Sequence, residues 1–275
     1  AMGGREVGGL ANMLAAHLEL ENHEHQQLVQ TFWGSPLIAK KPGLKAIDLF
    51  EAVESGKIKA IWIMATNPVV SLPNADQVKR ALDKCQFVVV SDICQDTDTT
   101  QYADVLLPAL GWGEKDGTVT NSERRISRQC QFLDAPEQTK ADWWAVSQVA
   151  QKMGFSGFDF KNSHEIFLEH AQLSAYQNLD ISSRQKIKNF RYFNLQGLTH
   201  LSLEAYQNLK PIQWPVLKND QNEAQYAQLF SEGQFSHADG KARFIATMAK
   251  KPINLPNAEY PLILNTGRIR DQWHT

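Results

Sequence analysis

The 275-residue sequence has almost no net charge and no long apolar run, and both absences exclude classes of protein. Its 28 basic and 30 acidic side chains leave a formal charge of −2, so the chain lacks the basic excess that grips nucleic acid. No apolar run approaches the ~20 residues that span a bilayer, and no secretory signal opens the chain. We therefore expect a cytoplasmic protein that binds neither nucleic acid nor membrane.

The chain is also poor in cysteine and lacks the glycine pattern of common nucleotide sites. Cys85, Cys94 and Cys130 are odd in number and widely spaced, so they form neither a disulfide framework nor a zinc or iron–sulfur ligand set. We expect them to be small buried hydrophobic side chains. No G-x-G-x-x-G follows the first apolar strand, so an ordinary nicotinamide site is not supported. The two-residue spacing of His23 and His25 favours a solvated pair over a metal site.

What the chain does contain is an alternation of short apolar runs and helical periods. Residues 58–66, 87–90 and 104–107 are rich in β-forming side chains, and residues 74–84 repeat apolar positions at helical spacing. The nearly continuous apolar run at 58–66 is typical of a strand buried on both faces of a parallel sheet. We therefore predict an α/β fold, with a doubly wound, mostly parallel Rossmann-like sheet and helices on both of its faces.

Further helical periods flank this sheet, whereas a long stretch near the end has no clear pattern. From residue 174 to about 256 the chain is rich in Gln, Asn, Ser and Lys, and only residues 239–245 carry a hairpin signal. Asp142 precedes a tryptophan-rich helical period and could cap it. The other predicted helices cover residues 6–18, 23–33, 44–55, 142–153 and 165–173.

Polar side chains follow the ends of the first two predicted strands. Asn67 comes after the first strand, and Ser91 and Asp92 end the second. Because a right-handed βαβ crossover brings the carboxyl ends of parallel strands to one edge, we expect a ligand crevice there. The Asp92 carboxylate could accept hydrogen bonds from a ribose or from a base such as guanine, while a role as a helix cap or turn former stays open.

A strongly polar segment follows the third predicted strand. Residues 103–127 hold Lys115 and many other charged side chains that no core could bury unpaired, so the segment is either a ligand cradle or a solvated loop. At the start of the chain, Gly3, Gly4 and Arg5 precede the first predicted helix. They would form an anion site or, with equal weight, a flexible terminus.

Four blocks of sequence, in order along the chain, resemble the molybdopterin oxidoreductase family. They are GREVGGLAN at residues 4–12, TNPVVSLP at 66–73, ADVLLPALGWGEKDGTVTNSERRIS at 103–127 and NTGRIRDQWHT at 265–275. Within the family, the likeness is closest to the assimilatory nitrate reductases. Formate dehydrogenases are an alternative, and so is the large iron–sulfur subunit of respiratory NADH dehydrogenase, although the intact TGR and SERR blocks weigh against the latter.

The resemblance implies that this chain is an internal fragment of a longer enzyme. Such enzymes reduce nitrate to nitrite at a molybdenum held by two molybdopterin guanine dinucleotides. An electron-donor protein or reductase subunit feeds a 4Fe-4S cluster in them. Because the family's metal ligands lie upstream, we expect no catalytic and no metal-binding residue here, an inactive fragment, and no retained cofactor. Residues 1–256 would be the family's third, α/β domain. Residues 257–275 would begin the barrel domain, with a first strand at 260–265.

The resemblance to the family also implies which individual residues of this chain contact the cofactor. Guanine N–H groups suit a carboxylate such as Asp92 or Asp142, while Lys115 and Arg268 suit a pyrophosphate. A salt-bridged scaffold behind the cradle is the favoured role of Asn121, Glu123, Arg124 and Arg125. The implied cofactor-binding residues are Asn67, Ser91, Asp92, Lys115, Asp142, Thr266, Gly267, Arg268, Gln272, Trp273, His274 and Thr275.

Overall fold

The computed structural model describes residues 2–178, 191–219, 221, 223–230, 233, 235, 237 and 239–264. The chain divides into two compact units, Ala1–Ala227 and Gln228–Thr275. The expected domain boundary after residue 256 stays a prediction. None of the helices in the described part of the chain has the length and apolar character needed to span a bilayer.

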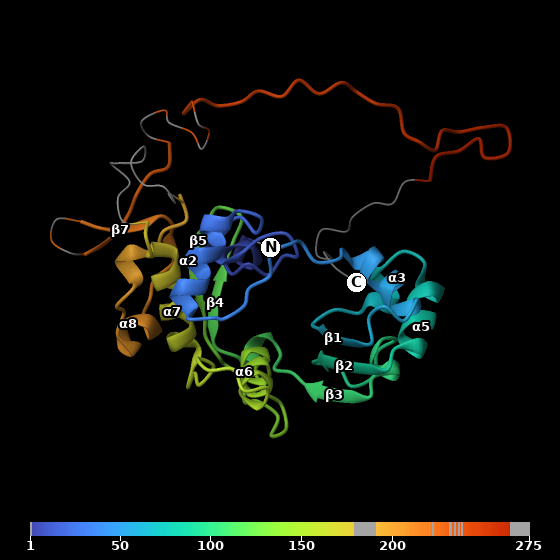
Figure 1. Ribbon diagram of the computed structural model, residues 1–275, viewed down its shortest axis with the longest axis horizontal. Coiled ribbons are helices and arrows are strands. Elements are labelled where there is room, and N and C mark those ends of the chain that lie inside the picture. The colour runs from blue at the N-terminus through green and yellow to red at the C-terminus, as the bar shows by residue number, and fades with distance from the viewer. Residues whose placement is uncertain are drawn as a thin grey trace. The chain divides into compact units, whose positions relative to one another are not determined.

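A parallel three-stranded sheet forms one part of the first unit. The strands β1 (Ala60–Met64), β2 (Phe87–Asp92) and β3 (Val105–Pro108) pair in the order β1-β2-β3, and their arrows point the same way in Figure 1. The predicted parallel α/β arrangement is therefore confirmed.

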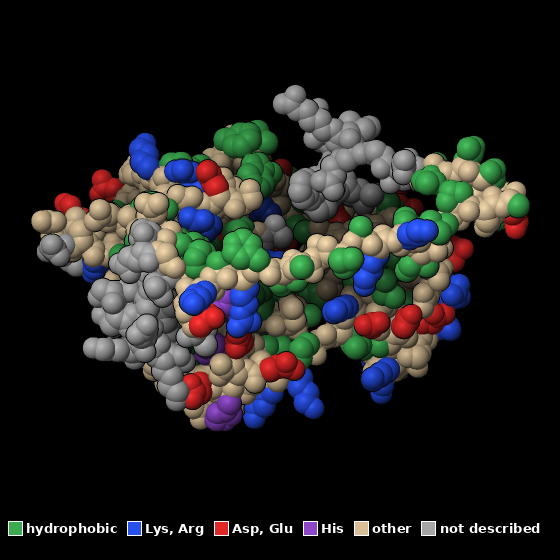
Figure 2. Space-filling model, turned by 90° about the horizontal axis from the view of Figure 1, so that it is seen from above, with side chains coloured by type: hydrophobic (Ala, Val, Ile, Leu, Met, Phe, Trp, Pro, Cys, Tyr) green, Lys and Arg blue, Asp and Glu red, His purple; other side chains and the backbone are tan. Residues whose placement is uncertain are grey.

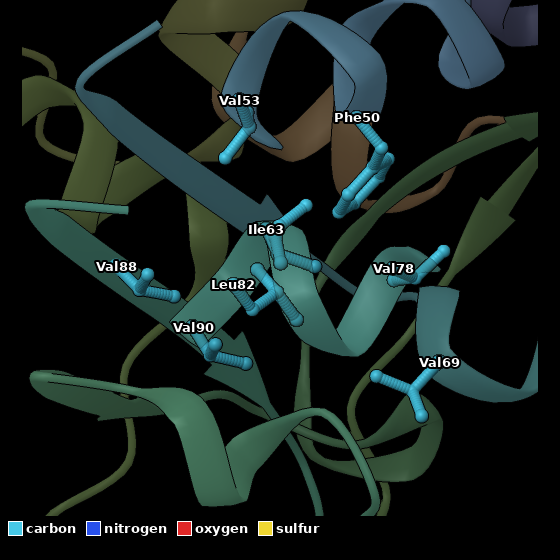
Figure 3. Packing of buried hydrophobic residues seen from close by; sticks show 9 residues of the cluster. Phe50, Val53, Ile63, Val69, Val78, Leu82, Val88 and Val90 are labelled. Atoms are coloured by element: carbon cyan, nitrogen blue, oxygen red, sulfur yellow. The ribbon is translucent and has the colours of Figure 1, made fainter. Parts of the chain in front are cut away.

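Helices cover one face of this sheet. Phe50 and Val53 of α3 (Ala46–Glu54) point toward Ile63 of β1, and Leu82 of α5 (Ala75–Lys84) packs beside them (Figure 3). α4 (Pro68–Ser71) completes the cover. The buried core side chains come from these three helices and from alternate positions of β1 and β2, as the two-residue period of strands requires.

The prediction that helices cover both faces of the parallel sheet is wrong for the described residues. Trp62 and Val89 point to that face and stay half-buried, and Val105 is exposed. The strand order explains this, because right-handed crossovers that advance in one direction place every helix on the same face. A doubly wound sheet needs a reversal of strand order, which the described strands do not contain.

The remaining strands of the first unit are antiparallel. β4 (Gly117–Thr120), β5 (Arg125–Gln129) and β6 (Ile212–Gln213) form one sheet, and β7 (Val216–Lys218) pairs with β8 (Ala224–Tyr226). The β4–β5 hairpin lies inside the segment that the sequence presented as a cradle or a loop. Its turn forms because Asn121 Oδ1 accepts the N–H groups of Glu123 and Arg125, and Arg124 adopts a positive φ of 67°.

Several predicted helices are confirmed, and local signals explain their ends. α2 (His23–Trp33) begins where Asn22 Oδ1 accepts the N–H groups of residues 24 and 25, and it ends at Gly34, which has a φ of 60°. α7 (Ser163–Ala175) begins with a similar cap from Asn162. α6 (Asp142–Lys152) also forms as expected, but its N-cap is Ala141, so the expected cap by Asp142 is wrong.

The predicted helix over residues 6–18 is wrong. α1 (Met2–Glu6) ends before Gly8, which has a φ of 71°, and the chain folds back so that a Cβ at Gly8 would lie 2.4 Å from the Ala15 nitrogen. The apolar spacing that suggested a helix therefore serves a tight loop. The remaining short elements are η1 (Ala15–His17), η2 (Thr100–Tyr102), η3 (Trp112–Glu114), η4 (Gln196–Leu198) and α8 (Leu203–Gln207).

The described residues of the second unit contain neither helix nor strand. Lys241 N–H donates to Asp239 Oδ1 in a turn, but the hairpin expected at 239–245 does not form. The described part of the strand expected at 260–265 is also irregular. A strand needs a partner for its backbone groups, and Leu262 and Leu264 here are 86% and 92% exposed. Green apolar side chains mark the surface of this stretch in Figure 2.

The expectation that all three cysteines are buried is wrong. Cys94 and Cys130 are exposed, because they lie in the irregular segments that follow β2 and β5. Cys85 is partly buried at the margin of the core around α5.

Candidate functional site

The carboxyl ends of four neighbouring chain segments meet at one edge of the parallel sheet. Ser91 is in register with Met64 on one side and with Leu107 on the other. Beyond β3, Ala109 forms a parallel bridge with Lys140, so the row of strands gains a fourth member. We call this the carboxyl edge, and it consists of residues 65–67, 91–92, 108–110 and 140–142. Ligands collect at such edges in open α/β sheets.

Asn67 stands at the first position of this edge, where the backbone leaves β1 in an uncommon conformation. Ala65 has a positive φ of 54°, and its N–H donates to the Ser91 carbonyl at 3.0 Å. Asn67 Oδ1 accepts a hydrogen bond of 2.6 Å from the hydroxyl of Thr99, which is fully buried. The oxygen of the amide is thus fixed. Among the described residues, its nitrogen has no hydrogen-bond acceptor, which leaves a donor available to a ligand.

Ser91 and Asp92 end β2 in different environments. Ser91 is 2% exposed, and its Oγ accepts a hydrogen bond of 2.9 Å from Trp62 Nε1. Asp92 is half-buried, and its Oδ1 accepts the N–H of Cys94 at 3.0 Å. The alternative reading of Asp92 as a turn former therefore holds for one oxygen. Its second oxygen makes no hydrogen bond within the described chain.

Lys115 and Asp142 form an ion pair, although 26 residues separate them in the sequence. Lys115 Nζ lies 3.7 Å from Asp142 Oδ2, and the two side chains are 32% and 33% exposed. The other oxygen of Asp142, Oδ1, is buried and has no hydrogen-bond partner within the described chain. A buried carboxylate oxygen without a donor is costly, so this atom marks a place where a ligand N–H or O–H would be favourable.

The interpretation of residues 121–125 as a scaffold agrees with the structure. Arg125 Nε donates to Glu123 Oε1 at 2.8 Å, and this bond is the main reason that the pKa of Glu123 lies below its usual range. Arg124 lies over the Trp214 ring at 5.3 Å from its centroid, and its Nε donates to the Trp214 carbonyl at 3.2 Å. These side chains are engaged with one another and with Trp214.

Sequence reasoning missed Glu6, which is a fixed point of the N-terminal segment. Glu6 is 2% exposed; its Oε1 accepts from Trp214 Nε1 at 2.6 Å, and its Oε2 accepts from Thr120 Oγ1 at 2.8 Å. Desolvation raises the pKa of its carboxyl group, and the two donated hydrogen bonds oppose that shift. The contact joins residues 208 positions apart, and no local pattern could have revealed it.

The other expected site residues fall outside this geometry. Thr266, Gly267, Arg268, Gln272, Trp273, His274 and Thr275 lie outside the described residues. Within the described ranges, no group of three or more His, Cys, Asp or Glu side chains could hold a metal ion. A cavity of about 510 Å³ is lined by residues 12–13 and 17–22 and includes none of the expected site residues.

Comparison with known proteins gives a consistent family. Residues 3–152, more than half of the chain, match the model of a family described as molybdopterin oxidoreductase. The nitrate reductase of Shewanella frigidimarina is 52% identical over 100% of this chain, which covers 28% of that protein. The assimilatory nitrate reductase catalytic subunit of Bacillus subtilis is 32% identical over 99% of this chain and 36% of its own length.

Two further similarities broaden this picture. The F420-dependent formate dehydrogenase subunit alpha of Methanocaldococcus jannaschii is 30% identical over 99% of this chain and 36% of its own length. Acetylene hydratase from Pelobacter acetylenicus superposes with a TM-score of 0.51 at 17% identity, over 87% of this chain and 28% of that one, which supports the fold alone. The chain thus spans about a third of the length of these relatives.

Proposed function

Because this chain belongs to the molybdopterin oxidoreductase family, we propose that it is a segment of a nitrate reductase whose carboxyl edge holds a guanine dinucleotide of the cofactor. When bound, the molybdenum group would supply the electrons that reduce nitrate to nitrite. This chain contributes binding and orientation. The 4Fe-4S cluster and a separate electron donor belong to the same proposal, as does a cytoplasmic location.

The observation that carries the proposal is the unpartnered, buried Oδ1 of Asp142 beside the ammonium group of Lys115. Guanine presents two adjacent N–H donors along its base-pairing edge, and a carboxylate can accept both. Lys115 supplies a point charge suited to the pyrophosphate. The residues present therefore fit the two chemical parts of a guanine nucleotide.

The neighbouring strand ends extend this site. Asn67 offers an amide donor, and Asp92 offers a carboxylate oxygen suited to ribose hydroxyls. Ser91 is too buried to present its side chain freely, so its role is to hold the end of β2 in place through Trp62. Residues 266–268 and 272–275 would add contacts from the start of the barrel domain, at residues 257–275.

The experiment measures the affinities of the 275-residue chain for GDP and for ADP by titration calorimetry. Asp142→Ala should weaken GDP binding by about tenfold or more, since hydrogen bonds to a charged group contribute about 1.5–3 kcal/mol and 1.4 kcal/mol is tenfold. It should leave ADP unchanged, because adenine lacks the paired donors. Lys115→Ala should weaken both nucleotides.

Lys152→Ala is the matched control, because Lys152 lies at the opposite end of α6 from Asp142 and is exposed. Equal affinity of the wild-type chain for GDP and ADP, or no effect of Asp142→Ala, would contradict the proposed guanine site. The formate dehydrogenase relative makes formate oxidation the second candidate activity. Assays of the full-length enzyme with nitrate and with formate separate the two.

A further inference from the structure

Lys115 is flanked by two acidic residues, and each of these is engaged away from it. Glu114 Oε2 accepts the Gly111 N–H at 2.7 Å. Asp116 Oδ1 lies 2.5 Å from Nη2 of Arg128 on β5. Neither neighbouring carboxylate therefore competes for the ammonium group of Lys115, which reaches Asp142 instead.

Arg128 is itself held firmly. Its side chain is 7% exposed, and its guanidinium carbon lies 3.9 Å from the ring centroid of Tyr206, which is 1% exposed. It also donates to the Gly117 carbonyl. A stacked, forked guanidinium has little freedom, so its bond to Asp116 fixes the position of that carboxylate.

A third element reaches the same carboxylate. Ser163 is the first residue of α7, and its hydroxyl donates to Asp116 Oδ2 at 2.7 Å. The Tyr206 hydroxyl in turn donates to Ser163 Oγ at 3.3 Å. Both oxygens of Asp116 are thus used by donors from β5 and α7. We call Asp116, Arg128 and Ser163 the anchor triad.

The extended backbone at Lys115 links the fixed position of Asp116 to the direction of the Lys115 side chain. Lys115 is extended, with φ −124° and ψ 156°, so successive side chains leave the chain on opposite sides. Asp116 faces Arg128 and Ser163, and Lys115 faces Asp142. Fixing the first side chain therefore sets the direction of the second.

We propose that the anchor triad positions Lys115 for the pyrophosphate of the guanine nucleotide and keeps its charge available, an inference that rests on the proposed function. Arg128 neutralises Asp116, and Ser163 fixes its orientation. These are positioning residues, because they act on the ligand only through Lys115.

The test compares GDP with guanosine, because Lys115 acts on the phosphates and the nucleoside lacks them. Binding is measured for the 275-residue chain, for Ser163→Ala, for Lys115→Ala and for the double variant. Ser163→Ala should weaken GDP binding by about threefold to tenfold, which corresponds to the lower part of the coupling energies found between groups in one network. It should leave guanosine binding unchanged, and it should add no loss once Lys115 is Ala. Ser163→Thr keeps the hydroxyl and should restore GDP affinity.

Three outcomes decide the matter. A loss for GDP alone that vanishes in the Lys115→Ala background supports the positioning role. An equal loss for guanosine, or a loss that persists without Lys115, assigns Ser163 a structural role and overturns the inference. If Lys115→Ala itself leaves GDP affinity unchanged, the proposed function fails first, and the anchor triad has no ligand to position.

Discussion

Replacing the buried Glu6 by alanine should be among the most damaging single changes in the first unit. The substitution removes two hydrogen bonds, of 2.6 Å from Trp214 Nε1 and 2.8 Å from Thr120 Oγ1. Thr120 is half-buried and can recover water, but Trp214 is 5% exposed, so its N–H would stay unsatisfied. An unsatisfied buried donor costs about 1–3 kcal/mol, and each lost bond to the carboxylate adds to that.

Relief of the buried charge offsets part of this cost, so the net destabilisation should be about 2–3 kcal/mol. For a unit of this size, each kcal/mol moves Tm by about 2–4 °C, which gives a fall of about 4–12 °C. Urea unfolding followed by tryptophan fluorescence measures the free energy directly. Glu51→Ala, at an exposed position of α3, is the control and should change stability by less than about 0.5 kcal/mol. A cost for Glu6→Ala no larger than that of the control would refute the reasoning.

The pH dependence of Glu6→Gln tests the electrostatic part of the same argument. Burial raises the pKa of the Glu6 carboxyl group in the folded state above its pKa in the unfolded chain. The contribution of this group to the free energy of unfolding is therefore fully present below the unfolded pKa, and it is lost as the pH rises through the folded pKa. Relative to the non-titrating glutamine variant, the wild-type chain should therefore lose stability as the pH rises above the usual glutamate pKa of 4.5. Histidine acts in the opposite direction, since desolvation lowers the pKa of the partly buried His170 to about 4. The comparison with glutamine cancels this effect.

Two further predictions concern the backbone and the cofactor site. Gly8→Ala should destabilise the chain by about 3 kcal/mol or more, because φ is 71° and a Cβ would meet the Ala15 nitrogen at 2.4 Å, while Gly4→Ala, with open space around it, should be nearly neutral in the same urea melts. Asp92→Ala in the full-length enzyme should weaken guanine dinucleotide retention by about 10–100-fold with the fold intact. Full molybdenum and pterin content with a lowered Tm would instead show that Asp92 is only a turn former.

The parallel sheet could be predicted from the sequence because its signals are local. Continuous apolar runs marked β1 and β2, and the helical period between them marked α5 within one residue. The same reasoning failed at residues 6–18, where apolar spacing typical of a helix serves a tight loop around Gly8. A helical period shows which side chains are buried, but not that the chain is helical, when a glycine with positive φ is needed inside it.

The stretch after residue 174 could not be assigned because distant contacts hold it. The guanidinium of Arg191 donates to the carbonyls of Leu173, Ser174 and Tyr176 at the end of α7. These bonds satisfy carbonyls that a helix end leaves open, and desolvation lowers the pKa of Arg191 to about 10. An arginine that caps a helix from beyond its end has no periodic signature. Arg128 and Ser163 were missed because their contacts with Asp116 also join separate segments and leave no periodic pattern.

The candidate site contains one feature that the sequence predicted and one that it could not predict. Topology alone predicted that Asn67 and Asp92 share an edge, and the register of β1 with β2 agrees. No local signal shows that Asp142 joins them, because its place depends on the bridge between Ala109 and Lys140. That bridge adds a fourth segment beside β3, so Asp92 and Asp142 follow two different members of the row of strands.

These two carboxylates differ in how many hydrogen bonds the described chain donates to them. Asp92 has one oxygen satisfied by the Cys94 N–H and is half-buried, so water can serve the other. Asp142 has one buried oxygen without a donor and keeps only a loose ion pair with Lys115 on the other. A ligand gains most where an existing penalty is removed, and a planar base with fixed N–H donors suits a buried acceptor better than a flexible sugar does. On the proposed function, the guanine therefore belongs to Asp142 and the ribose to Asp92, with the pyrophosphate at Lys115.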